Sequence, residues 1–168
     1  MLQLAIHFAQ TGDVIVVSAG EYEEAGSFGD VLGNACVAKG IAGIVTDTGV
    51  RDTADLIELG LPVFSRSVCI KGTVKETLGQ INKPIVVGGQ EIRPGDVIRG
   101  EADGLVTVRP EDAADVARRS AARDEAKAGY IEANLSNGVY RPSRLRARRR
   151  ARAQVFRRGH RRRPALWV

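Results

Sequence analysis

Two short segments carry residue types that could do chemistry together. One contains Gly29 and Asp30, and the other contains Arg51 and Asp52. Each segment stands where a predicted helix begins, and the unpaired backbone N–H groups there favour a bound anion. An arginine also supplies a guanidinium for a carboxylate, and an aspartate supplies an oxygen ligand for a hard cation. The two segments could therefore hold a 2-oxo acid, with Arg51 on its carboxylate and a metal ion on Asp52 polarising its carbonyl.

The same residues also have an ordinary structural interpretation. An aspartate that opens a helix is more often an N-cap than a metal ligand. In that case Asp30 and Asp52 cap helices, the neighbouring glycines form turns, and Arg51 pairs with a surface carboxylate. The residue types and their positions leave both interpretations open.

The elements that must position these segments follow from the pattern of apolar residues. Helices and strands alternate in the first part of the chain, with expected helices at residues 2–9, 29–39 and 52–59 and expected strands at residues 14–17 and 43–46. Residues 46–50 (TDTGV) are expected to form a tight loop before Arg51. Gly40 is placed to end the second helix.

From Leu61 onward the pattern changes to short strands separated by glycine and proline turns. The expected strands are residues 62–64, 84–87, 96–98 and 105–108. A long, alanine-rich helix is expected from Pro110 to about Asn134. An α/β half, a β-rich half and a closing helix together predict a single mixed α/β domain.

Charge separates the chain into two parts. The 168 residues carry a formal net charge of +5, but 12 of the 25 basic residues are arginines within residues 141–168, which contain no acidic residue. Residues 1–140 therefore hold 13 basic against 20 acidic residues. We predict an acidic folded domain over residues 1–140 and a disordered Arg-rich tail over residues 141–168.

The tail has two explanations. Runs of arginine neutralise phosphates and could bind nucleic acid. In contrast, Arg, Pro and Ala without Lys, Asp or Glu are typical of out-of-frame translation of a GC-rich gene. The composition favours the second explanation, so nucleic acid is expected as a partner only through this tail.

Several other classes of protein are not expected. No segment approaches the roughly 20 consecutive apolar residues of a membrane-spanning helix, and the start of the chain lacks the features of a secretory signal. Cys36 and Cys69 lack metal-ligand spacing and do not make a disulfide framework. His7 lies alone on an apolar segment and is expected to be structural. We expect a cytoplasmic protein with a small-molecule partner and no membrane partner.

The spacing of the candidate residues resembles a known motif. Twenty residues separate Asp30 from Arg51-Asp52, as in the Asp-x20-Arg-Asp motif of the class II pyruvate aldolases, in the family of the regulator of ribonuclease activity A. Further segments occur in that family's order over about residues 4–135: GDVIVV, GDVLGNACVAKGIAGIVTDTGVRD, LPVF, KGTVKETLG, PIVVGG, RPGDVI and ADGLVTV. KGTVKETLG is most similar to the 4-carboxy-4-hydroxy-2-oxoadipate aldolase branch.

The resemblance implies a fold, an assembly and an activity. The fold would be a swivelling β/β/α domain, assembled as a homotrimer or hexamer with sites between subunits. The activity would be divalent metal-dependent cleavage of 4-carboxy-4-hydroxy-2-oxoadipate or 4-hydroxy-4-methyl-2-oxoglutarate to pyruvate or oxaloacetate products, with oxaloacetate decarboxylation as a side activity. The alternative in the same family is a non-catalytic regulator that binds ribonuclease E, and KGTVKETLG beside the motif favours the enzyme.

The resemblance also implies roles for individual residues. The substrate-binding residues would be Gly29, Asp30, Val31, Leu32 and Arg51, with the backbone N–H groups of Val31 and Leu32 on the pyruvate carboxylate. Asp52 would hold Mg²⁺ or Mn²⁺, and Asp30 would position a water that carries the proton.

Two weaker candidates complete the site. Lys75 could bind the distal carboxylate of a dicarboxylic substrate, or it could be an ordinary solvated lysine. Glu125 could reach the site of a neighbouring subunit, although a solvated helix face explains it as well.

The sequence departs from the family pattern at both ends. Family members carry further residues before the position of Met1, including helices that pack on the domain, and these are expected to be missing here. After LSNGVY, the Arg-rich tail replaces the usual Leu-Asp-x-Tyr segment. Both departures put the stability, assembly and activity of the chain in doubt.

Overall fold

The computed structural model describes residues 1–20, 24–73 and 78–137. The chain divides into two compact units, and their described parts meet in sequence between Thr107 and Val108. Lys75 and the Arg-rich tail lie outside the described residues. The division of the chain at residue 140 therefore stays a prediction.

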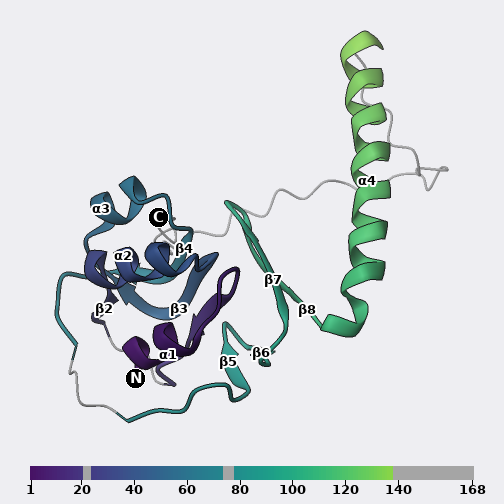
Figure 1. The fold of residues 1–168 in the computed structure, drawn as a ribbon. Coiled ribbons are helices and arrows are strands. Elements are labelled where there is room, and N and C mark those ends of the chain that lie inside the picture. Colours follow the sequence, from purple (N-terminus) through teal and green to yellow (C-terminus); the bar gives the residue numbers. More distant parts are fainter. Residues whose placement is uncertain (21–23, 74–77, 138–168) are drawn as a thin grey trace, which may run out of the picture. The chain divides into compact units, whose positions relative to one another are not determined.

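The first unit is built on a parallel sheet centred on β3 (Gly43–Val50). β1 (Val14–Val17) and β2 (Gly26–Phe28) pair with successive parts of β3, and β4 (Val63–Val68) pairs along its opposite edge. β3 therefore runs through the middle of the sheet (Figure 1), and seven of its eight residues are buried. Burial on both faces is typical of the central strand of a parallel sheet.

Three helices cover this sheet: α1 (Leu2–Phe8), α2 (Asp30–Lys39) and α3 (Thr53–Glu58). Their apolar residues join those of the strands in one core cluster: Ile6, Ile15, Phe28, Cys36, Ile41, Ile44, Val50, Leu56, Leu61 and Val63. Cys36 has no exposed surface, and this burial raises the pKa of its thiol to about 11. The Lys39 ammonium donates to the carbonyls of Ile6 and His7 at the end of α1. The His7 side chain itself is exposed, and its expected structural role stays a prediction.

The second part of the first unit consists of hairpins. β5 (Ile85–Val87) and β6 (Gln90–Ile92) form an antiparallel pair joined by Gly88 and Gly89. Both glycines have positive φ angles, 59° and 81°, as the turn of a two-residue hairpin requires. β7 (Val97–Glu101) pairs with β8 (Gly104–Val108).

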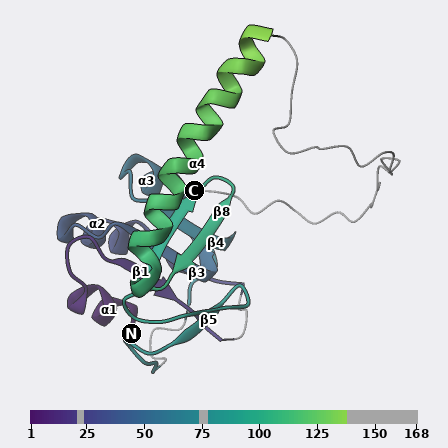
Figure 2. The same ribbon diagram turned by 90° about the vertical axis from the view of Figure 1, so that its right-hand side faces the viewer.

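The second unit contains α4 (Pro110–Asn137), a helix of 28 residues that Figure 2 shows as one continuous element. It begins at the predicted residue and extends slightly beyond the predicted end. Among the described residues, no helix combines the length and the apolar character that crossing a membrane would require.

The structure differs from the predicted strands at four places. Residues 46–50 do not form a tight loop, because β3 continues to Val50 with partners on both edges. The strand predicted at 62–64 begins at Val63 and runs to Val68, because it pairs with β3 as far as Val50. The loop after β1 and the turn after β5 each lead into a short strand that was not predicted, β2 and β6. Pairing between distant segments decides these cases, and local turn residues do not.

Candidate active site

The two candidate segments meet at the carboxyl ends of β2 and β3. β2 ends at Phe28, which pairs with Val50 at the end of β3. The chain then continues into Gly29 and α2 on one side, and into Arg51, Asp52 and α3 on the other. Because both strands are parallel, both helix N-termini open at the same edge of the sheet, where open α/β sheets bind ligands.

The Asp52 carboxylate links the two segments. Its Oδ2 accepts a hydrogen bond from the backbone N of Asp30 at 3.3 Å and lies 3.3 Å from Nε of Arg51. Arg51 also donates from Nη1 to the Gly26 carbonyl at 3.3 Å. About one third of each side chain is exposed, 38% for Arg51 and 33% for Asp52. The guanidinium and the carboxylate are therefore held in place and still open to a ligand.

The two aspartates do not cap the helices that they open. Asp52 occupies the N-cap position of α3, but its side chain makes no capping hydrogen bond and instead points to the start of α2. The N-cap of α2 is Gly29, and Asp30 is the first helical residue. Asp52 has φ 54° and ψ 41°, a left-handed conformation that Asp and Asn tolerate better than most residues.

Gly29 permits the close approach of the two segments. A Cβ at this position would lie 2.3 Å from Oδ2 of Asp52 and 3.0 Å from Cγ of Arg51. Any other residue would push the carboxylate or the guanidinium away. The space at the site therefore favours glycine, whereas φ of −153° shows that the backbone conformation does not require it.

The first turn of α2 supplies backbone donors to the same place. The N–H groups in the first turn of a helix have no carbonyl partner within that helix. The Asp30 N–H meets the Asp52 carboxylate, and the N–H groups of Val31 and Leu32 belong to the same turn. Val31 is 73% exposed, so this turn is open to solvent. The arrangement favours an anionic group beside Arg51.

The side chains at this place also decide which kind of metal ion the site could hold. The described part of the chain contains no group of three or more His, Cys, Asp or Glu residues placed to hold a metal. Mg²⁺ is commonly held by one or two carboxylates together with waters and substrate oxygens. The partly exposed Asp52 carboxylate, with a glycine rather than a side chain beside it, fits a cation of this kind held by one protein ligand.

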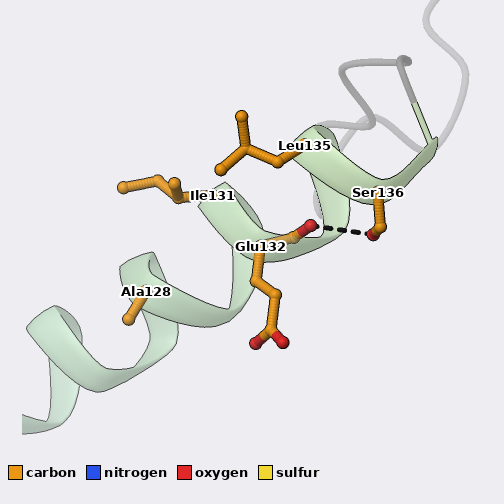
Figure 3. A pocket seen from close by; sticks show the side chains of 5 residues that line it. All are labelled: Ala128, Ile131, Glu132, Leu135 and Ser136. Carbon is orange, nitrogen blue, oxygen red and sulfur yellow. Dashed lines mark hydrogen bonds between the residues drawn. The ribbon is translucent and has the colours of Figure 1, made fainter.

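The two weaker candidates stay predictions. Lys75 lies outside the described residues, and Glu125 lies on the exposed surface of α4 in the second unit. A shallow groove on α4 is lined by Ala128, Ile131, Glu132, Leu135 and Ser136 (Figure 3), with Ser136 Oγ donating to the Glu132 carbonyl at 2.8 Å. It contains none of the predicted site residues.

Sequence reasoning missed the residues that support Arg51. The Gly26 and Phe28 carbonyls accept hydrogen bonds from Arg51. The hydroxyl group of Ser27, which lies between these two residues on β2, donates to the Gly49 carbonyl of β3. These supporting residues are hard to recognise in the sequence, because they are serines and threonines beside glycines in segments that were expected to be loops.

The comparison with known families decides the relationship. Residues 1–107, which include both candidate segments, match the family model described as RraA-like: Aldolase/RraA. The chain belongs to this family. The chain is similar to a Halalkalibacterium halodurans protein named "Putative 4-hydroxy-4-methyl-2-oxoglutarate aldolase", with 42% identity over 135 residues, 78% of this chain and 64% of that protein. The chain spans between 51% and 64% of the length of the first curated relatives it matches.

Solved structures share the fold of this chain. An uncharacterized protein from Pseudomonas syringae pv. tomato has a TM-score of 0.74 and 31% identity, over 80% of this chain and 68% of that one. Streptomyces coelicolor RraAS2, described as an unusual member of the RNase ES inhibitor RraA family, has a TM-score of 0.67 and 29% identity, over 75% and 65% of the two chains. The resemblance and the mixed α/β fold expected from the sequence are thus confirmed.

Proposed function

We propose that this chain is a divalent metal-dependent aldolase that cleaves 4-hydroxy-2-oxo acids to pyruvate or oxaloacetate products and also decarboxylates oxaloacetate. The substrates would be 4-carboxy-4-hydroxy-2-oxoadipate or 4-hydroxy-4-methyl-2-oxoglutarate, the second of which appears in the names of its relatives. One observation carries the proposal. The Asp52 carboxylate does not cap its own helix and instead stands beside Arg51 at the open N-terminus of α2.

Arg51 and the first turn of α2 would bind the 2-oxo acid. The guanidinium would take the C1 carboxylate through charge-assisted hydrogen bonds, and the N–H groups of Val31 and Leu32 would add backbone donors. The bond from Arg51 Nη1 to the Gly26 carbonyl orients the guanidinium before the substrate arrives. Preorganised donors of this kind lose little energy to rearrangement during the reaction.

Asp52 and Asp30 would then serve the chemical step. Bound at Asp52, Mg²⁺ or Mn²⁺ would supply positive charge to stabilise the oxygen that becomes negative when the carbon–carbon bond breaks. Asp30 would hold the water that delivers a proton to the carbon released by cleavage. Its place at the start of α2, one residue after Gly29, puts its carboxylate on the element that approaches Asp52.

Assembly and location are part of the same proposal. We expect a homotrimer or hexamer in the cytoplasm, with Glu125 and Lys75 as possible contributors to the site.

The alternative function is that of a protein-binding regulator. It is supported by the similarity to RraAS2, whose family is described as an inhibitor of RNase ES. A regulator would need no metal and no pocket for an oxo acid. The Arg51 and Asp52 side chains would then be surface residues of the kind that a protein partner contacts.

An assay of pyruvate release from oxaloacetate separates the two functions. We expect turnover by the full chain with Mg²⁺ or Mn²⁺, and its loss when a chelator removes the metal. The rate without protein in the same metal solution is the control, because divalent ions decarboxylate oxaloacetate slowly by themselves. Protein-dependent turnover that survives chelation, or no turnover with either metal, would reject the proposed function, and the second result would favour the regulator.

Replacing Gly29 with alanine tests whether the close approach matters. The added Cβ would stand 2.3 Å from Asp52 Oδ2, so the carboxylate must rotate away from the α2 N-terminus. Since a displacement of about 1 Å at a reacting centre can cost a hundredfold, we expect kcat/KM for oxaloacetate to fall between about tenfold and a hundredfold. Gly129→Ala on α4, where a Cβ meets open space, is the matched control. Equal activity of the two variants would show that Gly29 has no role at the site.

A further inference from the structure

The two carbonyls that hold Arg51 flank a single residue, Ser27. The Phe28 carbonyl accepts from the backbone N of Arg51 at 2.9 Å, and the Gly26 carbonyl accepts from its Nη1 at 3.3 Å. Between Gly26 and Phe28 the pairing of β2 with β3 shifts register, so Ser27 is the extra residue of a β-bulge. A bulge interrupts the ladder that would otherwise fix its carbonyls, and bulges often aim a side chain at an active site.

Side-chain hydrogen bonds replace the missing ladder at Ser27. Its hydroxyl bonds to the Thr48 hydroxyl and donates to the Gly49 carbonyl at 3.3 Å. The Thr48 hydroxyl also bonds to that of Thr46 at 2.8 Å, and Thr46 Oγ1 accepts from the backbone N of Thr48 at 3.1 Å. These three hydroxyl groups form a continuous chain from the interior of β3 to the bulge of β2.

The burial of these hydroxyl groups calls for an explanation. Thr46 and Thr48 are only 4% and 5% exposed, in the middle of a sheet where valine would fill the same space. A buried hydroxyl costs free energy unless it is hydrogen-bonded. The pairing of β3 with β4 is also irregular between Thr46 and Gly49, so the cluster stands where the ladders on both edges of β3 are interrupted.

We propose that the Ser27–Thr48 hydroxyl pair is a positioning device for Arg51. It pins the bulge of β2 to β3 and thereby fixes the Gly26 carbonyl that orients the guanidinium. The kinetic consequences of this inference rest on the proposed function, whereas its structural consequence does not. Thr48 is buried, and in this proposal both hydroxyls act through Arg51.

Two substitutions of Thr48 separate a hydroxyl role from a packing role. Thr48→Val keeps the volume and removes the hydroxyl, whereas Thr48→Ser keeps the hydroxyl and removes a methyl group. We expect Thr48→Val and Ser27→Ala to raise KM for oxaloacetate about fivefold to tenfold, the effect of one weakened hydrogen bond to a charged group. The kcat should change less than KM, and Thr48→Ser should restore the wild-type KM. Ser65→Ala, which removes a strand hydroxyl bonded to the Ser67 carbonyl at 3.1 Å, is the control and should leave KM unchanged.

A second readout does not depend on catalysis. The Nε–H signal of Arg51 in a proton–nitrogen NMR spectrum can be assigned by its loss in Arg51→Lys. We expect this signal to be slow to exchange in the wild type and in Thr48→Ser, and to exchange at least about threefold faster in Thr48→Val and Ser27→Ala.

The outcomes distinguish the inference from the proposed function. An Arg51 signal that is unaffected by Thr48→Val overturns the positioning role, whether or not the chain is an aldolase. A larger defect in Thr48→Ser than in Thr48→Val shows a packing role and also overturns it. A wild type without turnover, but with an Arg51 signal that changes as expected, rejects the proposed function and retains the positioning role.

Discussion

Asp52→Asn is expected to reduce metal-stimulated pyruvate release from oxaloacetate by about two orders of magnitude or more. In the proposed mechanism Asp52 is the one protein ligand of the metal ion, and a Lewis acid contributes several kcal/mol to a reaction of this kind. An asparagine amide is neutral and binds Mg²⁺ or Mn²⁺ far more weakly than a carboxylate. The measurement is the initial rate at several metal concentrations, with the melting temperature recorded for the same preparation.

Asparagine is a more specific substitution than alanine at this position, because it disturbs the local structure less. Asp52 has a left-handed backbone with φ 54°, a conformation that asparagine tolerates and that strains alanine by about 1–2 kcal/mol. The asparagine oxygen can also keep the hydrogen bond from the Asp30 backbone N, which alanine cannot. Loss of activity in Asp52→Asn can therefore be assigned to the charge and to metal binding, and not to a disturbed turn.

Asp55→Asn is the matched control for this substitution. Asp55 lies in the first turn of α3, three residues after Asp52, and is exposed. Removing its charge changes the local field at α3 by a similar amount but removes no proposed ligand. Full metal-stimulated turnover in Asp52→Asn would reject the metal site, and equal losses in both variants would point to a general electrostatic effect.

The sequence was sufficient to name the candidate site residues but not to predict how they contact one another. The spacing of Asp30 and Arg51-Asp52 can be read from the sequence alone. The direction of the Asp52 side chain is not local, because it depends on how closely α2 approaches α3. Gly29 was expected to form a turn or to line the substrate pocket, and the structure adds that its missing Cβ makes room for Oδ2 of Asp52.

The support behind Arg51 could not be predicted, for a related physical reason. Residues 46–50 contain Asp, Thr and Gly, which are typical of a turn. They form a strand because β2 and β4 supply partners from both sides. The hydrogen bond between Ser27 and Thr48 joins residues 21 positions apart, and it exists only after this register is set. Helices such as α4, whose signals lie within a few turns of sequence, were predicted almost to their ends.

Arg51→Lys is the second substitution with a large expected effect. The C1 carboxylate is common to the substrate, the transition state and pyruvate, so Arg51 should stabilise all three. Lysine keeps the positive charge but loses the planar fork that can bind a carboxylate through two parallel hydrogen bonds. It also loses the bond from Nη1 to the Gly26 carbonyl that orients the guanidinium.

We therefore expect a higher KM together with a smaller fall in kcat. A hydrogen bond between charged groups contributes about 1.5–3 kcal/mol, which corresponds to roughly tenfold to a hundredfold in kcat/KM. The fall in kcat should appear because a carboxylate held by a flexible ammonium orients the carbonyl less well on the metal. Steady-state kinetics with oxaloacetate at saturating Mg²⁺ measures both constants.

Arg99→Lys provides the comparison for Arg51→Lys, since Arg99 is an exposed arginine on β7 with no place in the proposed site. It should behave as the wild type. If Arg51→Lys also stays within about a factor of two of the wild type, a range smaller than the loss of even one such hydrogen bond, then Arg51 does not bind the substrate. An exposed arginine beside an aspartate would then be better explained as part of a protein-binding surface, and the regulator would become the favoured function.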